Sequence, residues 1–93
     1  MEFNAVKIAR GIRDYCDGAA ADMSAGYENG TYDAAKADEL YDDPGAMGDI
    51  IGDKLCWDGF DRKKNKEQRA LVIAELRKMM NHLPPKMWDC LLK

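Results

Sequence analysis

The chain has 93 residues, a third of them charged, and a formal net charge of −3. A chain of this length forms a single domain and buries only somewhat more than about 60% of its unfolded surface, so we expect a small core and no deep catalytic cleft. It has no run of 18 apolar residues, and residues 1–20 lack the basic start and apolar centre of a signal peptide. We therefore expect no membrane span and a cytoplasmic location.

Residues 2–27 form the first predicted helix. Its apolar residues recur at steps of three and four, which places them on one face. Gly11 and Gly18 each cost up to about 1 kcal/mol of helix propensity. We interpret them as sites of close packing against another helix, and a locally weak helix is the alternative. The predicted inner face consists of Ala5, Ile8, Ala9, Ile12, Tyr15, Cys16, Ala19 and Met23.

A turn and a short acidic helix follow. Asn29-Gly30 is typical of a turn, and Thr31 is predicted to cap the next helix with Asp33 in its first turn, where a negative charge is favourable. The inner face of this helix is predicted to consist of Ala34, Ala37, Leu40 and Tyr41. Its outer face is acidic and contains Asp38, Glu39, Asp42 and Asp43.

Asp43-Pro44 predicts the start of a third helix, with Asp43 as the cap and proline in the first helical position. This helix runs to about Leu55. Gly48 and Gly52 lie four residues apart and can form a ridge of small residues that contacts another element. A loop with one helical turn is the alternative for this segment.

The next segment, CWDGFDRKK, is predicted to be a connection with a turn at Asp58-Gly59. We expect Trp57 and Phe60 to fold back into the core. The central helix then runs over residues 65–83, with Asn65 and Gln68 as a capping pair and Pro84-Pro85 as the stop. Its solvated face is predicted to hold Glu67, Arg69, Glu75, Arg77, Lys78 and Asn81.

Pro85 is predicted to open a short final helix that docks through its apolar residues. These elements predict an all-α fold, a compact single-domain bundle of four to five helices over residues 1–93. An α+β fold with strands in Lys54–Phe60 or Arg69–Leu76 is the alternative, but alternation there is poor. The predicted core includes Ile12, Cys16, Met23, Tyr41, Ile51, Leu55, Val72, Leu76, Met80 and Trp88.

No catalytic, metal or cofactor site is predicted. Cys16, Cys56 and Cys90 are an odd number at wide spacings, which favours reduced thiols over a disulfide framework. With His82 they offer the ligand types of a zinc site, but no pair has the short spacing that such sites use. We expect His82 to interact with carbonyls at the end of its helix. Neither nucleophile–base sets nor phosphate-binding glycine loops are found in the sequence.

Charge divides between the two halves of the chain. Residues 1–53 contain twelve acidic and four basic residues, a net charge of −8, whereas residues 54–93 carry +5. Short aspartate side chains in such an array can imitate spaced phosphates. We therefore expect a non-enzymatic interaction or inhibitor protein that binds a protein partner with a basic, nucleic-acid-binding surface. Size and missing chemistry suggest an inhibitor of the kind that phages and other mobile elements encode. The candidate acidic surface consists of Asp14, Asp17, Asp33, Asp38, Glu39, Asp42, Asp43, Asp49 and Asp53.

Two alternatives remain at this point. The basic loop and the start of the central helix can bind nucleic acid, with phosphates on the cations and bases on exposed rings. The residues for that function are Trp57, Phe60, Arg62, Lys63, Lys64, Lys66 and Arg69. The basic segment can instead neutralise the acidic one inside the same fold. Self-association is also expected, since glycine- and alanine-lined helices in a small core often complete their burial with another copy.

Overall fold

Five α-helices make up the part of the chain that the computed structural model describes, residues 3–24 and 34–93 without the side chains of 23, 24 and 34. The helices are α1 (Ala5–Ser24), α2 (Ala34–Tyr41), α3 (Pro44–Trp57), α4 (Lys66–Met79) and α5 (Pro85–Leu92). No strand occurs in these ranges, so the all-α prediction is confirmed and the α+β alternative is wrong. The predictions for Asn29-Gly30, Thr31, Asp33 and the side chain of Met23 lie outside the described part.

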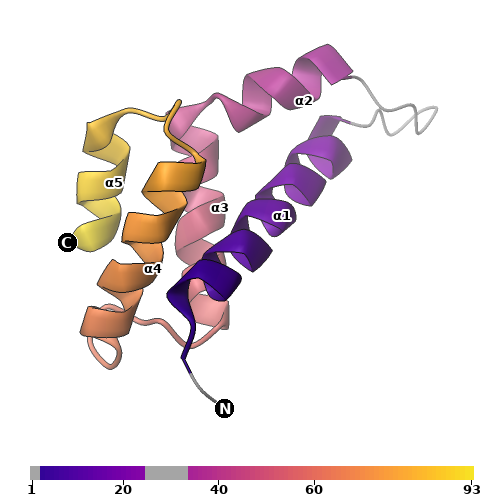
Figure 1. Cartoon of the computed structure of the whole chain (residues 1–93). Helices are drawn as coiled ribbons and strands as arrows, with labels where there is room; N and C mark the ends of the chain where they lie inside the picture. The colour runs from indigo at the N-terminus through magenta and orange to yellow at the C-terminus, as the bar shows by residue number, and fades with distance from the viewer. Residues whose placement is uncertain (1–2, 25–33) are drawn as a thin grey trace.

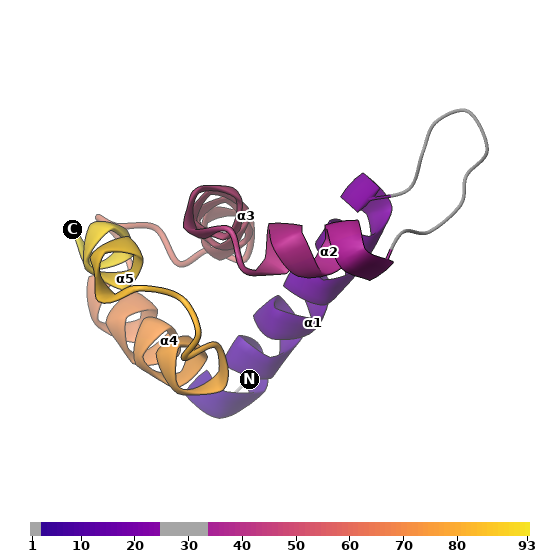
Figure 2. The ribbon, with the colours of Figure 1, turned by 90° about the horizontal axis from the view of Figure 1, so that it is seen from above.

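The helices pack around α1 and α3. Helix α1 contacts α2, α3 and α4, and the short α5 covers α3 and α4 on the other side (Figure 1). Seen from above, α4 and α5 lie side by side, and α2 crosses the C-terminal half of α1 (Figure 2). The molecule is therefore elongated, with extents of 43 × 29 × 20 Å along its three principal axes. Within the described residues, no helix is both long and apolar enough to cross a membrane.

The core follows the predicted apolar faces. Tyr41 is only half-buried and packs against the edge of the core. The final helix docks as expected through Met87, Trp88 and Leu91, while Leu92 stays exposed. The other predicted core residues that the structure describes are all buried: Ile12, Cys16, Ile51, Leu55, Val72, Leu76, Met80 and Trp88.

Helix α3 begins as predicted. A carboxylate oxygen of Asp43 accepts hydrogen bonds from the backbone N–H groups of Gly45, at 2.9 Å, and Ala46, at 3.3 Å. Proline at the first helical position needs no hydrogen-bond partner for its nitrogen, so the start is well satisfied. The glycine ridge is also confirmed. A methyl group added to Gly48 or Gly52 would lie 3.4 Å from Met87 or 3.5 Å from Leu91, so this side of α3 faces α5 closely.

Two predictions about the central helix are wrong. Asn65 makes no side-chain capping bond, because its amide instead donates to the carbonyl of Gly59 and ties the preceding turn together. The helix also ends at Met79, not at Leu83. Met80 and Leu83 are still buried, since the chain turns inward through hydrogen bonds from Met80 N to Leu76 O and from Leu83 N to Met80 O before reaching the prolines.

The glycines of α1 do not pack closely against the described residues. Among those residues, a methyl group added to Gly11 or Gly18 would meet nothing within 4 Å. Both residues face outward, so the interpretation as sites of close packing is wrong for this fold. Gly59 is different: its φ of +89° lies in the left-handed region that glycine adopts without strain, and it closes the predicted Asp58-Gly59 turn.

The open space at Gly18 and the positive φ of Gly59 predict that alanine substitutions at these two positions change the free energy of unfolding in opposite directions. Gly18→Ala should raise the free energy of unfolding by up to about 1 kcal/mol, because alanine favours the helix and has open space for its methyl group. Gly59→Ala should lower it by about 1 kcal/mol or more, because the turn would be strained. Urea unfolding followed by circular dichroism measures both. If Gly18→Ala instead lowered the free energy of unfolding, another group would have to contact this exposed position.

Candidate interaction surfaces

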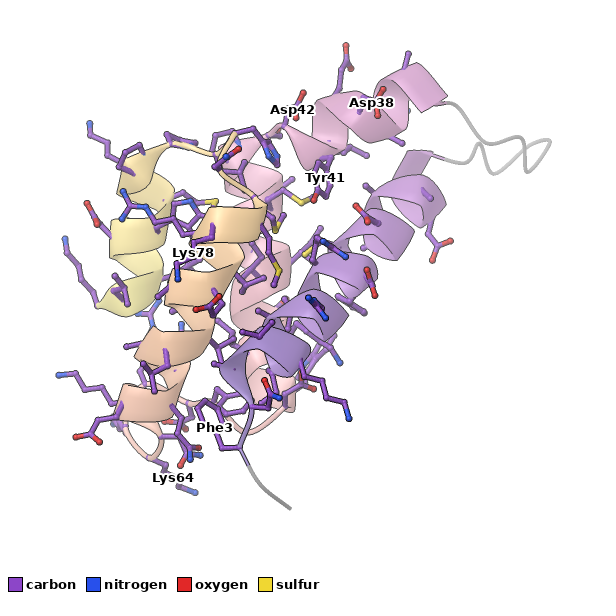
Figure 3. All side chains as sticks on the ribbon, viewed as in Figure 1. Phe3, Asp38, Tyr41, Asp42, Lys64 and Lys78 are labelled. Atoms are coloured by element: carbon purple, nitrogen blue, oxygen red, sulfur yellow. The ribbon has the colours of Figure 1, made fainter. Side chains whose placement is uncertain are left out.

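The acidic helix and the basic loop lie at opposite ends of the molecule. Figure 3 shows Asp38 and Asp42 along α2 at one end and Lys64 at the other. No ion pair joins residues 38–43 to residues 62–66 anywhere in the described part of the chain. Within these ranges the basic segment therefore does not neutralise residues 38–43 through direct ion pairs. Asp49 lies nearer to the basic loop, since it lines one hollow together with Arg62.

Two acidic residues, Asp17 of α1 and Asp42 just after α2, act on Tyr41, the last residue of α2. Burial is the largest cause that raises the pKa of this phenol, and the negative charges of Asp17 on α1 and Asp42 add to it, while Arg13 opposes them. Burial likewise raises the pKa of the nearby Cys16 thiol to about 11, with a further contribution from Asp17. The fold thus places Asp17 of α1 near Tyr41, the last residue of α2.

Three of the candidate acids have partners within the fold. The Asp43 carboxylate caps α3, as described above. Asp42 Oδ1 lies 3.6 Å from His82 Nε2, and Asp14 Oδ1 lies 3.4 Å from an Arg13 guanidinium nitrogen. Such exposed pairs contribute little to stability. Of these three candidate acids, Asp43 is the one whose carboxylate the fold needs.

Five other candidate acids are exposed and form no ion pair or hydrogen bond with a described residue. Their charges face water from three helices of the same half of the chain. Exposed carboxylates of this kind act on a partner over roughly a Debye length, about 8 Å at physiological ionic strength. They are Asp17, Asp38, Glu39, Asp49 and Asp53.

His82 binds a helix carbonyl, but not one of its own helix. Its Nε2 lies 3.0 Å from the carbonyl oxygen of Tyr41, and its ring stacks on the Tyr41 ring with centroids 4.9 Å apart. Because α4 ends before His82, the side chain can reach the C-terminus of α2 instead. It thereby anchors the acidic helix to the turn that follows α4.

The turn in the basic loop is stabilised by Asp61, a residue that the sequence did not single out. One carboxylate oxygen of Asp61 accepts hydrogen bonds from the backbone N–H groups of Lys63 and Lys64, and these bonds lower its pKa. Arg62 donates to the carbonyl of Cys90 at 3.3 Å and stays exposed. The side chains of Lys63, Lys64 and Lys66 are exposed as well.

Arg69 is not on the surface, which overturns its predicted place on the solvated face. Its side chain is only 3% exposed. Its guanidinium donates two hydrogen bonds to Leu91 O, at 3.2 and 3.0 Å, and one to Phe60 O at 2.9 Å. Burial is the largest cause that lowers its pKa. Arg69 therefore holds the fold together and has no free donor face for a phosphate.

Trp57 is also misplaced by the sequence prediction. It is 67% exposed instead of buried, and its ring forms a T-shaped pair with the ring of Tyr15 at a centroid distance of 6.1 Å. Lys54 Nζ lies 5.2 Å from the centre of the Tyr15 ring. Phe60 is half-buried and packs on Phe3. A step of eight residues from Asp49 through Asp53 to Trp57 was the signal that this ring faces outward with the acids.

The cysteines remain separate thiols. Cys16 is buried, Cys56 and Cys90 are exposed, and all three are free. No group of three or more histidine, cysteine or acidic side chains is placed to hold a metal ion within the described ranges. The exposed thiols therefore have no ligand partners there.

Comparisons with known proteins add no functional information. No protein-family model, curated protein or solved structure matches this chain.

Because the Arg69 guanidinium is buried and Lys64 is exposed, neutralising these two residues should have different effects on the free energy of unfolding. Arg69→Gln should lower the free energy of unfolding by about 2–4 kcal/mol, because the carbonyls of Leu91 and Phe60 lose charged donors. Lys64→Gln removes the same charge from the surface and should change it by less than about 0.5 kcal/mol. Urea unfolding of both variants checks this. Equal midpoints would contradict the structural role of Arg69.

Proposed function

We propose that this chain is a small non-enzymatic interaction protein whose acidic surface binds a protein partner with a basic face. The observation that carries the proposal is the separation of charge. Exposed carboxylates that form no ion pair with a described residue lie on α1, α2 and α3, and the basic loop lies at the end of the molecule away from Asp38 and Asp42 (Figure 3). Charge that is not neutralised within the fold remains available to steer a partner of opposite charge.

The chemistry of the acids favours a partner that ordinarily binds nucleic acid. Aspartate holds its charge close to the backbone, so the spacing of the helices fixes the spacing of the charges. A rigid array of this kind can occupy cationic sites that normally take phosphates. The result would be inhibition by competition, and an inhibitor encoded by a phage or another mobile element fits the small size of the chain.

The structure sharpens the variant that tests this proposal. Asp43 must be kept, because loss of a capping carboxylate costs about 1 kcal/mol of stability. Asp38→Asn with Glu39→Gln removes two exposed charges from α2 without touching a described contact. Glu67→Gln with Asp89→Asn makes the same change of net charge on exposed sites of α4 and α5 and is the matched control.

We expect the α2 double variant to bind the partner about tenfold more weakly at low salt, with a smaller dependence on salt, because steering and contact charges are both lost. Binding is measured on the protein that the parent chain captures from its native host. The α4–α5 control should bind that protein like the parent. Equal binding by both double variants would contradict the role of the acidic surface.

The basic loop supports a second candidate function, nucleic-acid binding. The observation that favours this function is that four neighbouring basic side chains are all exposed: Arg62, Lys63, Lys64 and Lys66. Phe60 is half-buried against Phe3, and Arg69 is turned inward, so two of the seven residues predicted for this function are not available as predicted. The net charge of −3 also opposes binding to a polyanion.

Filter binding at low salt tests this second function. If the loop binds phosphates, the logarithm of the affinity should fall by roughly 0.7–0.9 per logarithm of salt for each phosphate contacted. Lys63→Ala with Lys64→Ala should flatten that slope by up to about 2. Single- and double-stranded DNA and RNA are compared. If none is retained at micromolar protein, this candidate function is wrong.

A further inference from the structure

The two C-terminal helices enclose a groove along their common edge. Helix α5 runs back along α4, because Arg69 near the start of α4 binds the carbonyl of Leu91 near the end of α5, and the two helices lie side by side in Figure 2. Between them lies a hollow of about 480 Å³, a size that is typical of sites for small molecules. Its apolar lining includes Ala70, Ile73, Ala74, Leu83, Trp88 and Leu92.

The charged lining of this hollow is basic. It consists of Arg77 and Lys78 in the last turn of α4, and Figure 3 labels Lys78. Lys78 is paired with Glu75 at 3.1 Å, whereas Arg77 is exposed and forms no ion pair or hydrogen bond with a described residue. The other acids of the two helices, Glu67 and Asp89, do not line the hollow. The Arg77 guanidinium is therefore a free cation beside an apolar floor.

An unpartnered donor belongs to the same hollow. Trp88 lines it with a fully buried side chain, and the indole Nε1–H has no hydrogen-bond acceptor among the described residues. A buried donor without an acceptor destabilises a fold, and such groups are rare in proteins. A ligand oxygen that enters the hollow beside Trp88 would supply the acceptor.

The other end of the groove is basic as well. A smaller hollow of about 110 Å³ shares Ala70 and Leu92 with the first, so the two form one groove. Setting aside Lys93, the last residue of the sequence, three cations line this end. Arg62 and Arg69 already donate to backbone carbonyls, so they contribute a positive potential and not a free guanidinium. The basic residues of the smaller hollow are Arg62, Lys66, Arg69 and Lys93.

We infer that this groove, defined by Ala70, Ala74, Arg77, Trp88 and Leu92, binds a small anionic amphiphile, a medium-chain alkyl carboxylate. The carboxylate pairs with Arg77 and accepts from the Trp88 indole, and the alkyl chain lies over the two alanines toward Leu92. The step from Ala70 to Arg77 spans about 10 Å of helix, which limits the length of chain that the apolar floor covers. The basic lining favours a carboxylate over an ammonium ligand, and the apolar floor favours an amphiphile over a small hydrophilic anion. The inference does not depend on the acidic surface.

Decanoate below its micelle concentration is the probe, with decyltrimethylammonium and acetate for comparison. The Trp57→Phe variant serves as the parent, because Trp57 lines neither hollow and Trp88 is then the only tryptophan. Its indole gives a single cross-peak in a two-dimensional nitrogen–proton NMR spectrum. Decanoate should move this cross-peak downfield in a saturable way, since the Nε1–H gains an acceptor. Decyltrimethylammonium and acetate should leave it in place.

Variants of the groove locate the ligand. Arg77→Gln should weaken decanoate binding about tenfold, because the ion pair with the carboxylate is lost. Ala74→Phe changes an exposed helical position and should abolish binding by filling the groove. Lys66→Gln should weaken binding by no more than about threefold, since it acts only from a distance. Lys64→Gln removes the same charge outside both hollows and should bind like the parent.

Several results would overturn the inference. One is no binding of decanoate at millimolar concentration, and another is binding that Arg77→Gln and Ala74→Phe leave unchanged. Equal weakening by Lys66→Gln and Arg77→Gln, or an unmoved indole cross-peak, would contradict the place assigned to the carboxylate. A dimer in light scattering that Ala74→Phe dissociates would mean that a second copy covers the groove. An acidic amphipathic peptide that binds through Ala74 where decanoate does not would make the groove a docking site for a partner helix.

Discussion

The buried guanidinium of Arg69 is the interaction on which the C-terminal half of the fold depends. A charged group in the core is tolerated only if its hydrogen bonds are satisfied, and Arg69 donates to Leu91 O twice and to Phe60 O once. Leu91 lies at the C-terminal end of α5, where the helix dipole favours a positive charge. An eight-residue helix is too short to be stable alone, so α5 needs this bond and the burial of Trp88 against the core.

The same interaction explains why the two charged regions stay apart. By holding Phe60 O, Arg69 fixes the start of the basic loop beside the first turn of α4, and Asp61 then shapes the loop through its bonds to Lys63 and Lys64. At the other end of α4, His82 binds the last carbonyl of α2 and fixes the acidic helix there. The length of α4 therefore separates the two regions, which is a consequence of topology and not of local charge.

Local signals in the sequence predicted the helices well, because they concern neighbouring residues. Asp43-Pro44 and the apolar periodicity placed α3 and most of the core. The failures have different causes, and only one of them involves a partner far away in the chain. The apolar periodicity of the central helix places Arg69 on the solvated face. Its side chain is buried because it donates to the carbonyl of Leu91, 22 residues later. A large aromatic side chain such as Trp57 is typical of a core. In α3, however, Trp57 lies on the side of Asp53 and away from the buried Leu55. Asn65 likewise lost its expected cap to the carbonyl of Gly59.

Two exposed features of α1 and α3 lower the stability of the chain. Gly11 and Gly18 each cost α1 up to about 1 kcal/mol of propensity with no packing gain among the described residues, and Trp57 leaves most of a large apolar ring in water. A domain this small has only about 5–15 kcal/mol of total stability, so such losses matter. Neither feature is required by the packing of the helices. Both are local costs that the burial of the core has to offset.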